Sequence, residues 1–572
     1  MARTTVTGET APSRASADSS AGSRSRSTPA TDAAAPWRGR WWRHTLVLLA
    51  LLGVVGPIAL ARIAFAASPL GPDQGLYVTV GELIKRGGVP WRDAWDNKPP
   101  GTYYLYAGVL AAAPPYTREC VFHGRPFPAQ DGLHIACAQI ALSLFDGLYA
   151  LATAAVVGWI GRTLFGRAVG WLAAVLFAVF ASMYQIARLG GLPDLHALLP
   201  LSLAFAAAVR FGDTGRGRWL VAAGAAAAVA ALFKQTGLLA LVGLVAWLVG
   251  RDLARLGLGG LGHRRGLRGA VSGSALLLLG AAGVLGAAAA IFARLGVLPD
   301  MVYQTVLWNV AYVAAPPDGD NFFKRAVQQT LTVFVGSQSG LWVAAVGGAL
   351  LLPRAIRQDQ RLGLLAAWAL TAVASVALGN ARFNQYYFVV LVPPLAILGA
   401  WGLVELWQSS RAVARSWIAV AIGGFAVFSG QGQMQILQDA WYQRITSTRW
   451  TAEENVSGAL REAQGSLYIW GNASQVYAIS GRPPASRYLQ SLAISNDFML
   501  NREVQRNRAE LMAGLAAAPP RWIAFDTPWL KAQRSLDFPE LRALVSREYE
   551  LANDPKNPIQ GGWEVYRHRN GP

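Results

Sequence analysis

Residues 44–65, HTLVLLALLGVVGPIALARIAF, decide the fold class of this chain. The run contains a single Arg and no acidic residue, and about 20 apolar residues suffice to cross a bilayer as a helix. It is too long for the apolar core of a signal sequence, and no clear cleavage site follows it. We therefore predict a first transmembrane helix. The basic stretch WRGRWWRH (37–44) before it places the N-terminus on the cytoplasmic side.

The rest of the chain repeats this pattern. Of the 572 residues, 53% are hydrophobic and only 15% are charged, whereas ordinary soluble domains carry roughly 25% charged residues. Further apolar runs have limits near 133–160, 168–184, 195–209, 219–233, 236–250, 269–293, 336–352, 362–379, 386–404 and 417–430. These runs exclude a soluble, fibrous or disordered protein. They predict a mainly α, polytopic membrane protein with about 11 transmembrane helices.

Basic residues gather in the short loops between these runs and account for the net charge of +19. Eleven spans put all the basic loops on the cytoplasmic side, as the positive-inside rule requires. A single helix over 219–250 would send the later basic loops, including 251–268, outward. The break at 233–237 (FKQTG) is therefore predicted to be a turn between two short spans. This placement of the charge also argues against nucleic acid as a partner.

The segments between and beyond the spans define the expected domains. Residues 1–36 are rich in Ser, Thr, Ala and Arg and predict a disordered cytoplasmic tail. Residues 37–430 form the expected transmembrane domain, with a long outer loop over 66–132. In the tail, 431–572, buried strands are predicted at 466–471, 521–527 and 563–569, with a helix at 502–518. We expect a small extracytoplasmic α/β domain there.

The stretch GPDQGLYVTVGELIKRGGVPWRDAWDNKPPGTYYLYAG (71–108) directly follows the first predicted helix. It contains Asp73, Asp93 and Asp96, together with Lys98, among aromatic residues. A carboxylate at a membrane boundary is costly unless it is solvated or paired, so this group predicts a polar cavity at the interface. The alternative is a loop that is polar because water surrounds it. In that case Asp93 and Asp96 order turns rather than act on a substrate.

Three stretches carry a resemblance to a known family. Asp73-Gln74, Tyr77 and then GGVPWRDAWDNKPPG (87–101) resemble the first periplasmic loop of the GT-C glycosyltransferases. The nearest likeness is to bacterial relatives of dolichyl-phosphate-mannose protein mannosyltransferases and of the aminoarabinose transferase that modifies lipid A. RFNQYYFVVLVPPLAILGAWG (382–402) is similar to a late helix of that family, and LYIWGNASQVYAISGRPPASRY (467–488) to the outer tail domain of its bacterial members.

This resemblance implies a multi-pass cell-membrane enzyme of the cell envelope. Such an enzyme passes a sugar from a polyprenyl-phosphate carrier to an acceptor hydroxyl on the outer side of the membrane. Asp73 matches the position of the family's catalytic carboxylate, which takes the proton from the acceptor. Gln74 stands where many members have Glu, which argues against a metal-binding acidic pair. No cofactor is expected, and a divalent metal ion is the alternative. The acceptor, a glycan, a lipid or a protein, is left open by the sequence.

A second carboxylate, Asp194 in ARLGGLPDLHALLPL (187–201), opens the fourth predicted span on its outer end. The family often places an acidic residue here, which makes Asp194 a second catalytic candidate. The alternative role is a helix N-cap, a common use of Asp after such a turn. His196 lies close by, and a histidine there is more often packed or hydrated than catalytic.

Cations for the carrier phosphate are expected at three outer positions. Lys98 lies where the first loop returns to the membrane, Lys234 at the turn between two short spans, and Arg382 at the outer start of the tenth span. Lys offers a point charge and Arg a two-pronged fork to phosphate oxygens. Tyr386 and Tyr387 follow and are expected to donate hydrogen bonds to the same oxygens. The alternatives are snorkelling of Arg382 and an aromatic belt for the tyrosines.

Two further residue pairs stay open. Cys120 and Cys137 flank a segment expected outside the membrane, where a disulfide and two free thiols are both compatible with the sequence. Arg482 and Arg487 either contact an anionic acceptor or support the fold of the tail.

The main prediction is an inverting membrane glycosyltransferase that uses a single displacement. The alternatives are a transporter or flippase of a lipid-linked or anionic substrate and an inactive relative that serves as a scaffold. A transporter places its charges near the bilayer midplane within broken helices, whereas the charges identified here gather at one face.

Overall fold

The structure is a computed structural model. It describes residues 35–118, 120–122, 125–126, 136–183, 190–256, 262–310, 322–379, 383–411, 413, 415, 451–495, 501–532, 538–553, 556 and 561–570. The chain divides into two compact units, residues 1–49 and 50–572, and every contact reported below lies within the second. The expected tail (1–36) is described only at its last two positions. The span predicted at 417–430 and the domain boundary predicted at 430/431 lie outside the described residues.

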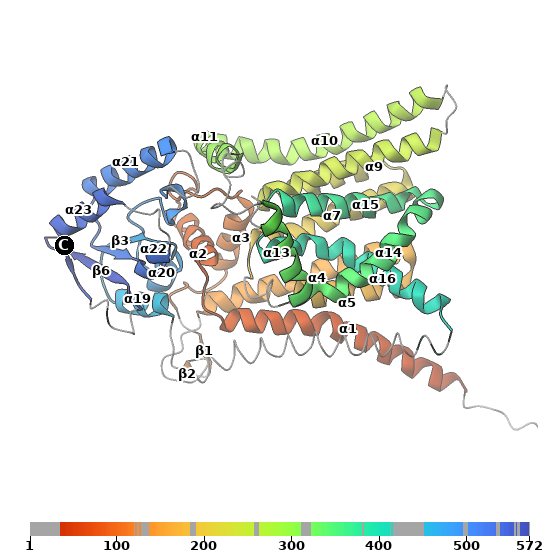
Figure 1. The fold of residues 1–572 in the computed structure, drawn as a ribbon, viewed down its shortest axis with the longest axis horizontal. Coiled ribbons are helices and arrows are strands. Elements are labelled where there is room, and N and C mark those ends of the chain that lie inside the picture. Colours follow the sequence, from red (N-terminus) through yellow and green to blue (C-terminus); the bar gives the residue numbers. More distant parts are fainter. Residues whose placement is uncertain are drawn as a thin grey trace, which may run out of the picture. The chain divides into compact units, whose positions relative to one another are not determined.

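Helices make up most of the described chain (Figure 1). The first set comprises α1 (Ala35–Ala67), α2 (Pro72–Lys85), α3 (Gly101–Ala111), α4 (Cys137–Phe165), α5 (Arg167–Ala181), α7 (Pro193–Thr214), α8 (Arg218–Phe233), the short turn η1 (Gln235–Leu238), α9 (Leu239–Leu256) and α10 (Gly262–Arg294). The second set comprises α11 (Leu298–Val302), η2 (Tyr303–Leu307), α13 (Phe322–Val333), η3 (Phe334–Gln338), α14 (Ser339–Gln358), η4 (Gln360–Leu362), α15 (Gly363–Ala377), η5 (Gln385–Leu391) and α16 (Val392–Ser409). A short hairpin, β1 (Val121–Phe122) and β2 (Arg125–Pro126), lies in the outer loop.

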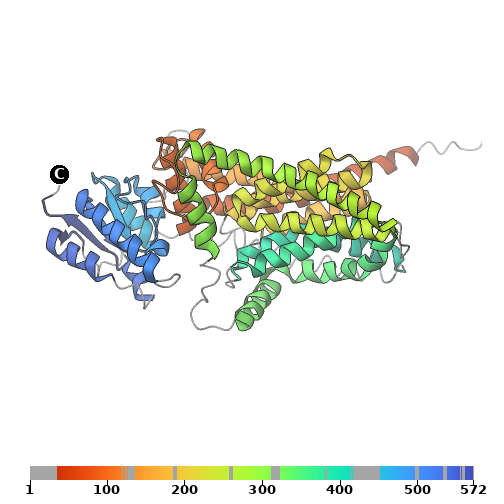
Figure 2. The same ribbon diagram turned by 90° about the horizontal axis from the view of Figure 1, so that it is seen from above.

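The helices expected to cross the membrane lie side by side (Figures 1 and 2). Among the described residues, eight helices are long and apolar enough to span a bilayer, and α5 and α8 are apolar but shorter. The chain is a multi-pass membrane protein with a mainly α fold, as predicted. The count of about 11 spans stays a prediction.

The turn predicted at 233–237 is present. α8 starts just beyond the end of α7 and ends at Phe233. The ammonium group of the next residue, Lys234, pairs with Asp194 at the start of α7. α9 then returns to the end of α7, where the guanidinium of Arg251 lies 4.8 Å from the ring centre of Phe211. The chain therefore reverses direction at η1, and one long helix over 219–250 is excluded.

Glycines allow α8 and α10 to pack closely. A Cβ atom at Gly224 would lie 1.8 Å from the carbonyl oxygen of Leu277, and one at Gly280 would lie 2.0 Å from that of Val221. Small residues at a helix crossing let the two backbones approach, which is how helices associate in lipid without a hydrophobic driving force.

The tail contains a four-stranded sheet of order β3-β4-β6-β5. Its strands are β3 (Leu467–Trp470), β4 (Trp522–Phe525), β5 (Tyr549–Leu551) and β6 (Glu564–His568). β3 and β4 are parallel, and the other two pairings are antiparallel. The helices of the tail are α19 (Ala452–Arg461), α20 (Gln475–Ser480), the turn η7 (Ser491–Ala493), α21 (Asn501–Ala517), α22 (Thr527–Ala532) and α23 (Pro539–Glu548). The three predicted strands and the helix at 502–518 are all present.

Both faces of this sheet are covered, because side chains alternate along each strand. Tyr468 and Ile523 belong to the apolar cluster that includes α21 and α23, whereas Leu467 and Ala524 face α19 and α20. Figure 1 shows helices on the two sides of the sheet. Burial on both faces explains why β3 appears in the sequence as a continuous apolar run.

The tail packs directly against the outer loop. A Cβ atom at Gly75 in α2 would lie 2.3 Å from the backbone nitrogen of Gln475 in α20. The backbone N–H of Trp95 donates a hydrogen bond to the carbonyl oxygen of Arg487 (2.8 Å). One apolar cluster includes Tyr77 of the loop together with Leu467 and other tail residues. Loop and tail therefore share a core.

Candidate active site

A cavity of about 880 Å³ lies where the outer loop, the helix ends and the tail meet. Six residues predicted as site residues line it: Asp73, Lys98, Asp194, Lys234, Tyr386 and Tyr387. They come from α2, the return of the outer loop, α7, the α8–α9 turn and η5. The outer loop therefore lines a cavity through Asp73 and Lys98, but not through Asp93 or Asp96, and the action of these residues on a substrate stays a prediction.

Asp73 lies in the first turn of α2, directly after Pro72, the first residue of that helix. Pro suits this position because its ring fixes a helical φ and no N–H bond is lost there. Among the described residues, the structure gives the carboxylate of Asp73 no hydrogen bond or ion pair. The group faces the cavity and is available to a substrate.

Asp194 and Lys234 form an ion pair in the cavity wall. Asp194 also follows a helix-opening proline, Pro193, but the N-cap of α7 is Leu192, and no side chain caps the helix. The alternative role of Asp194 as N-cap is thus wrong. The ammonium of Lys234 lies 3.9 Å from the ring centre of Tyr387, which adds a cation–π attraction.

Lys98 is held from two sides. Its ammonium lies 3.5 Å from Asp96 Oδ1 and 5.6 Å from the ring centre of Tyr77. Asp96 is buried outside the cavity and also accepts a hydrogen bond from the hydroxyl of Tyr103. Burial, together with the nearby Asp96 charge, raises the pKa of Tyr103 well above its ordinary value, so this hydroxyl stays a donor. Asp96 therefore positions Lys98.

A polar group beside Lys98 was missed by sequence reasoning. The side-chain amide of Asn309 donates to the carbonyl oxygen of Asn97 (2.6 Å), and that of Gln235 donates to the same oxygen and to the carbonyl of Thr305 (3.0 Å each). All four residues line the cavity. The available signal was an amide next to Lys234 and another, Asn309, within a mostly apolar run.

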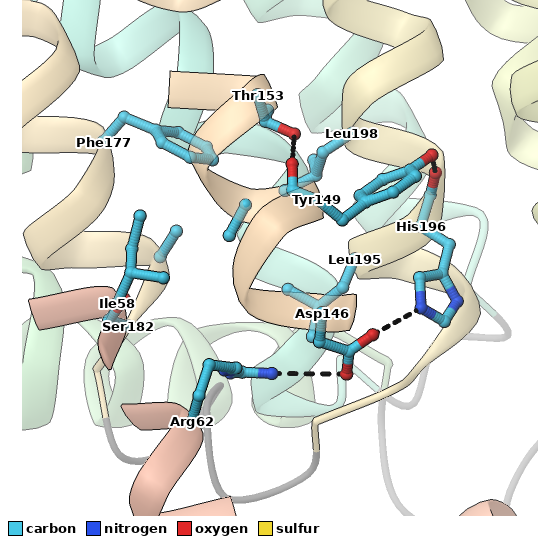
Figure 3. Close-up of a pocket in the computed structure, with 12 residues that line it drawn as sticks. Ile58, Arg62, Asp146, Tyr149, Thr153, Phe177, Ser182, Leu195, His196 and Leu198 are labelled. Carbon is cyan, nitrogen blue, oxygen red and sulfur yellow. Dashed lines mark hydrogen bonds and ion pairs between the residues drawn. The ribbon is translucent and has the colours of Figure 1, made fainter. Parts of the chain in front are cut away.

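His196 does not reach this cavity. It lies in a closed cluster, shown in Figure 3, where Nε2 is 3.0 Å from Asp146 Oδ1 and Arg62 Nη1 is 3.3 Å from Asp146 Oδ2. The enclosed space is about 30 Å³, enough for about one water molecule. His196 is 1% exposed, so the packed alternative is confirmed. Arg62 and Asp146 were not singled out, although charges within apolar runs were the available signal.

The remaining predicted residues lie elsewhere. Asp93 accepts the backbone N–H of Val89 (2.7 Å) and pairs with Arg92; the Arg92 hydrogen bond lowers the pKa of Asp93. Asp93 does not line the cavity. It orders a turn, which was the alternative role considered for it. Arg382 lies outside the described residues.

Three other open points have structural answers. The Gln74 side chain donates to the carbonyl oxygen of Gly190 (3.0 Å) and does not line the cavity. Arg482 bonds the carbonyl of Ala463, and Arg487 pairs with Glu510 (2.8 Å), so both support the tail. Cys120 and Cys137 are free thiols.

No group of three or more potential metal ligands occurs within the described residues.

Comparison with known proteins identifies the fold. A profile of the dolichyl-phosphate-mannose-protein mannosyltransferase family matches residues 137–258, a stretch that contains Asp194 and Lys234 but not Asp73. A search of curated protein sequences finds no match.

Solved structures match over most of the chain. ArnT from Cupriavidus metallidurans in the apo state is 16% identical, with a TM-score of 0.55 over 92% of this chain and 98% of that one. The same protein bound to undecaprenyl phosphate is 15% identical, with a TM-score of 0.56 over 93% of this chain and 99% of that one. A third match is the archaeal oligosaccharyltransferase AglB from Archaeoglobus fulgidus in complex with an inhibitory peptide and a dolichol-phosphate. It is 11% identical, with a TM-score of 0.50 over 86% of this chain and 70% of that one. The chain has the fold of the GT-C membrane glycosyltransferases, as the resemblance implied.

Proposed function

We propose that this protein is a membrane glycosyltransferase that moves a sugar from a polyprenyl-phosphate donor to an acceptor hydroxyl on the outer side of the membrane. One observation carries the proposal. A single cavity joins the carboxylate of Asp73, which has no ion pair among the described residues, the cations Lys98 and Lys234, and an apolar face. Base, phosphate site and lipid site are the three elements that this reaction needs.

The reaction is an inverting single displacement. The acceptor oxygen forms a bond to the anomeric carbon while the bond from that carbon to the phosphate oxygen breaks. The acceptor proton goes to the Asp73 carboxylate, and the departing polyprenyl phosphate keeps the electron pair. Lys98 and Lys234 stabilise the charge that grows on the phosphate, and Tyr387 orients Lys234. Stabilisation that increases toward the transition state lowers the barrier.

The carrier tail has its own surface. Apolar side chains line one side of the cavity, and these five are between 40% and 66% exposed: Leu238, Val242, Val306, Val310 and Leu378. In a membrane such a surface faces lipid and suits an isoprenoid chain. Two of the matched structures contain undecaprenyl phosphate and a dolichol-phosphate, which supports a donor of this class.

Two further features belong to the proposal. We assign no metal ion to the reaction, because Gln74 rather than a carboxylate accompanies Asp73 and is engaged with Gly190. The lining charges sit at helix starts and at the α8–α9 turn, which favours a transferase over a transporter with charges in mid-span. The proposed orientation keeps the N-terminus cytoplasmic and the tail outside.

Replacing Asp73 with Asn tests this function. A positioned general base contributes roughly 10²–10⁴-fold to the rate, so D73N should lower sugar transfer by that factor. The measurement is transfer of radiolabelled sugar from polyprenyl-phosphate donors in membranes that contain the full chain.

Asp300 supplies a matched control, because it also follows a proline in the first turn of a helix, α11, but does not line the cavity. Asp300→Asn should transfer sugar at the wild-type rate. Undiminished transfer by D73N, with the protein present in equal amount, would remove Asp73 from the role of base.

A further inference from the structure

The tail supplies one wall of the cavity, and this wall differs from the rest. Its five lining residues are Asn472, Gln490, Leu492, Ser495 and Trp529. Asn472 follows β3, and Trp529 lies in α22, just after β4. Because β3 and β4 are parallel, both residues lie at the carboxyl edge of these strands, where α/β sheets commonly bind ligands.

The chemistry of this wall is neutral. It offers two side-chain amides, a hydroxyl and a half-buried indole, and none of the described tail residues that line the cavity is charged. Ser495 is 1% exposed, and its hydroxyl has no hydrogen-bond partner among the described residues. A buried polar group without a partner is costly, so a ligand that bonds it would remove that cost.

The wall lies beside the proposed base. The hydroxyl of Ser474 and the amide of Gln490 both donate to the carbonyl oxygen of Pro72 (2.5 and 3.2 Å), the residue before Asp73. In a single displacement the acceptor oxygen attacks from the side opposite the leaving phosphate and meets the base. The cations mark the phosphate side, so the groups that contact the Asp73 turn belong to the acceptor side.

We infer that the acceptor is a neutral glycan bound by Asn472, Gln490, Ser495 and Trp529, an inference that rests on the proposed function. A sugar ring presents hydroxyls around its rim and C–H groups on its faces. Side-chain amides and a serine hydroxyl match the rim, and an indole packs against a C–H face. An anionic acceptor would call for Arg or Lys, which the described lining of this wall does not provide.

Two binding measurements on the full chain in detergent test this inference. The first applies the protein to an array of neutral oligosaccharides, phosphorylated glycans and peptides. The second titrates undecaprenyl phosphate and counts bound lipid by native mass spectrometry. The variants are Trp529→Ala and Asn472→Ala, with Trp407→Ala as control because Trp407 in α16 is 43% exposed and does not line the cavity.

The wild type should capture neutral oligosaccharides. Removal of a central Trp commonly weakens binding by about tenfold or more, so Trp529→Ala should bind glycans at least that much more weakly. Asn472→Ala should weaken glycan binding as well, and Trp407→Ala should bind like the wild type. All three should bind undecaprenyl phosphate like the wild type.

Capture of peptides or phosphorylated glycans alone, no capture at all, or wild-type glycan binding by Trp529→Ala would overturn the inference. The donor side is tested separately by Lys234→Gln. If that variant binds undecaprenyl phosphate as tightly as the wild type, the phosphate site of the proposed function fails, whichever glycan is bound.

Discussion

Asp194 and His196 are two residues apart on α7, yet Asp194 belongs to a charged cluster that lines a large cavity and His196 to one that is tightly packed. Asp194 pairs with Lys234 in the wall of an 880 Å³ cavity, whereas His196 joins Asp146 and Arg62 around about 30 Å³. A helix turns about 100° per residue, so side chains two apart point to nearly opposite sides. Buried charge alone therefore does not mark a candidate site in this protein; the candidate site is distinguished by a cavity large enough for a substrate.

The two clusters also differ in what happens when a partner is lost. Arg62 and Asp146 have side chains only 10% and 7% exposed and enclose room for about one water molecule. Lys234 is 15% exposed beside a large cavity. The side chain of Asp194 is only 4% exposed, but the cavity beside it has room for water, whereas the space beside Asp146 is small. The closed cluster should therefore affect stability and the open one activity.

Arg62→Met should have the largest effect on stability. Breaking a buried ion pair by removing one partner costs about 3–5 kcal/mol, since the other charge stays buried. The double variant Arg62→Met/Asp146→Leu should recover more than half of that loss, because no carboxylate remains. Denaturant unfolding in detergent measures both. A stable Arg62→Met protein that fails to transfer sugar would contradict the comparison and place Arg62 in the reaction.

Lys234→Gln should act on the rate. Loss of one group that stabilises transition-state charge costs on the order of 10²–10³-fold. Stability should fall by less than in Arg62→Met, because water in the large cavity can solvate the carboxylate of Asp194 that loses its partner. Parallel transfer assays and unfolding curves separate the two effects. A stability loss as large as that of Arg62→Met, with the rate of the folded fraction unchanged, would show that this pair is structural as well.

Asp526 extends the comparison to a buried carboxylate without an ion pair among the described residues. It follows β4, its Oδ1 accepts the N–H of Trp529 (3.2 Å), and burial raises its pKa to about 6. The folded tail then keeps a proton that the unfolded chain releases near pH 4. The contribution of this carboxyl group to stability is therefore fully present below about pH 4 and is lost, by up to about 3 kcal/mol, as the pH rises through 6.

Hydrogen exchange of the β3 and β4 amides in the full chain, followed from pH 4 to pH 7, measures this trend against Asp526→Asn. The Asn variant should lack this part of the pH dependence. Equal slopes in the two proteins would show that the carboxyl of Asp526 titrates normally.

Local patterns predicted much of the site. Asp73 and Asp194 were identified by their places at the edges of apolar runs together with the family resemblance. Lys98 and Lys234 were identified by their places at the outer ends of such runs, and the positive-inside rule placed Lys234 in a turn. The contacts Arg62–Asp146, Asn97–Asn309 and Gln490–Pro72 were not predicted. Their partners are 84, 212 and 418 residues apart, and no periodicity encodes a partner at such a distance. Strand β5 was also missed, because three residues give too little alternation.

The amino-acid sequence by itself determined that the chain crosses a membrane, roughly where most of its long helices and three of its tail strands lie, and which polar residues lie near their ends. These properties depend on local hydrophobicity and charge. Only the tertiary structure decided which of these residues meet. In the folded chain Asp194 lines the large cavity, His196 lies in the packed cluster with Asp146 and Arg62, and the neutral wall of the tail lies beside Asp73. Such choices depend on how helices and sheet pack together.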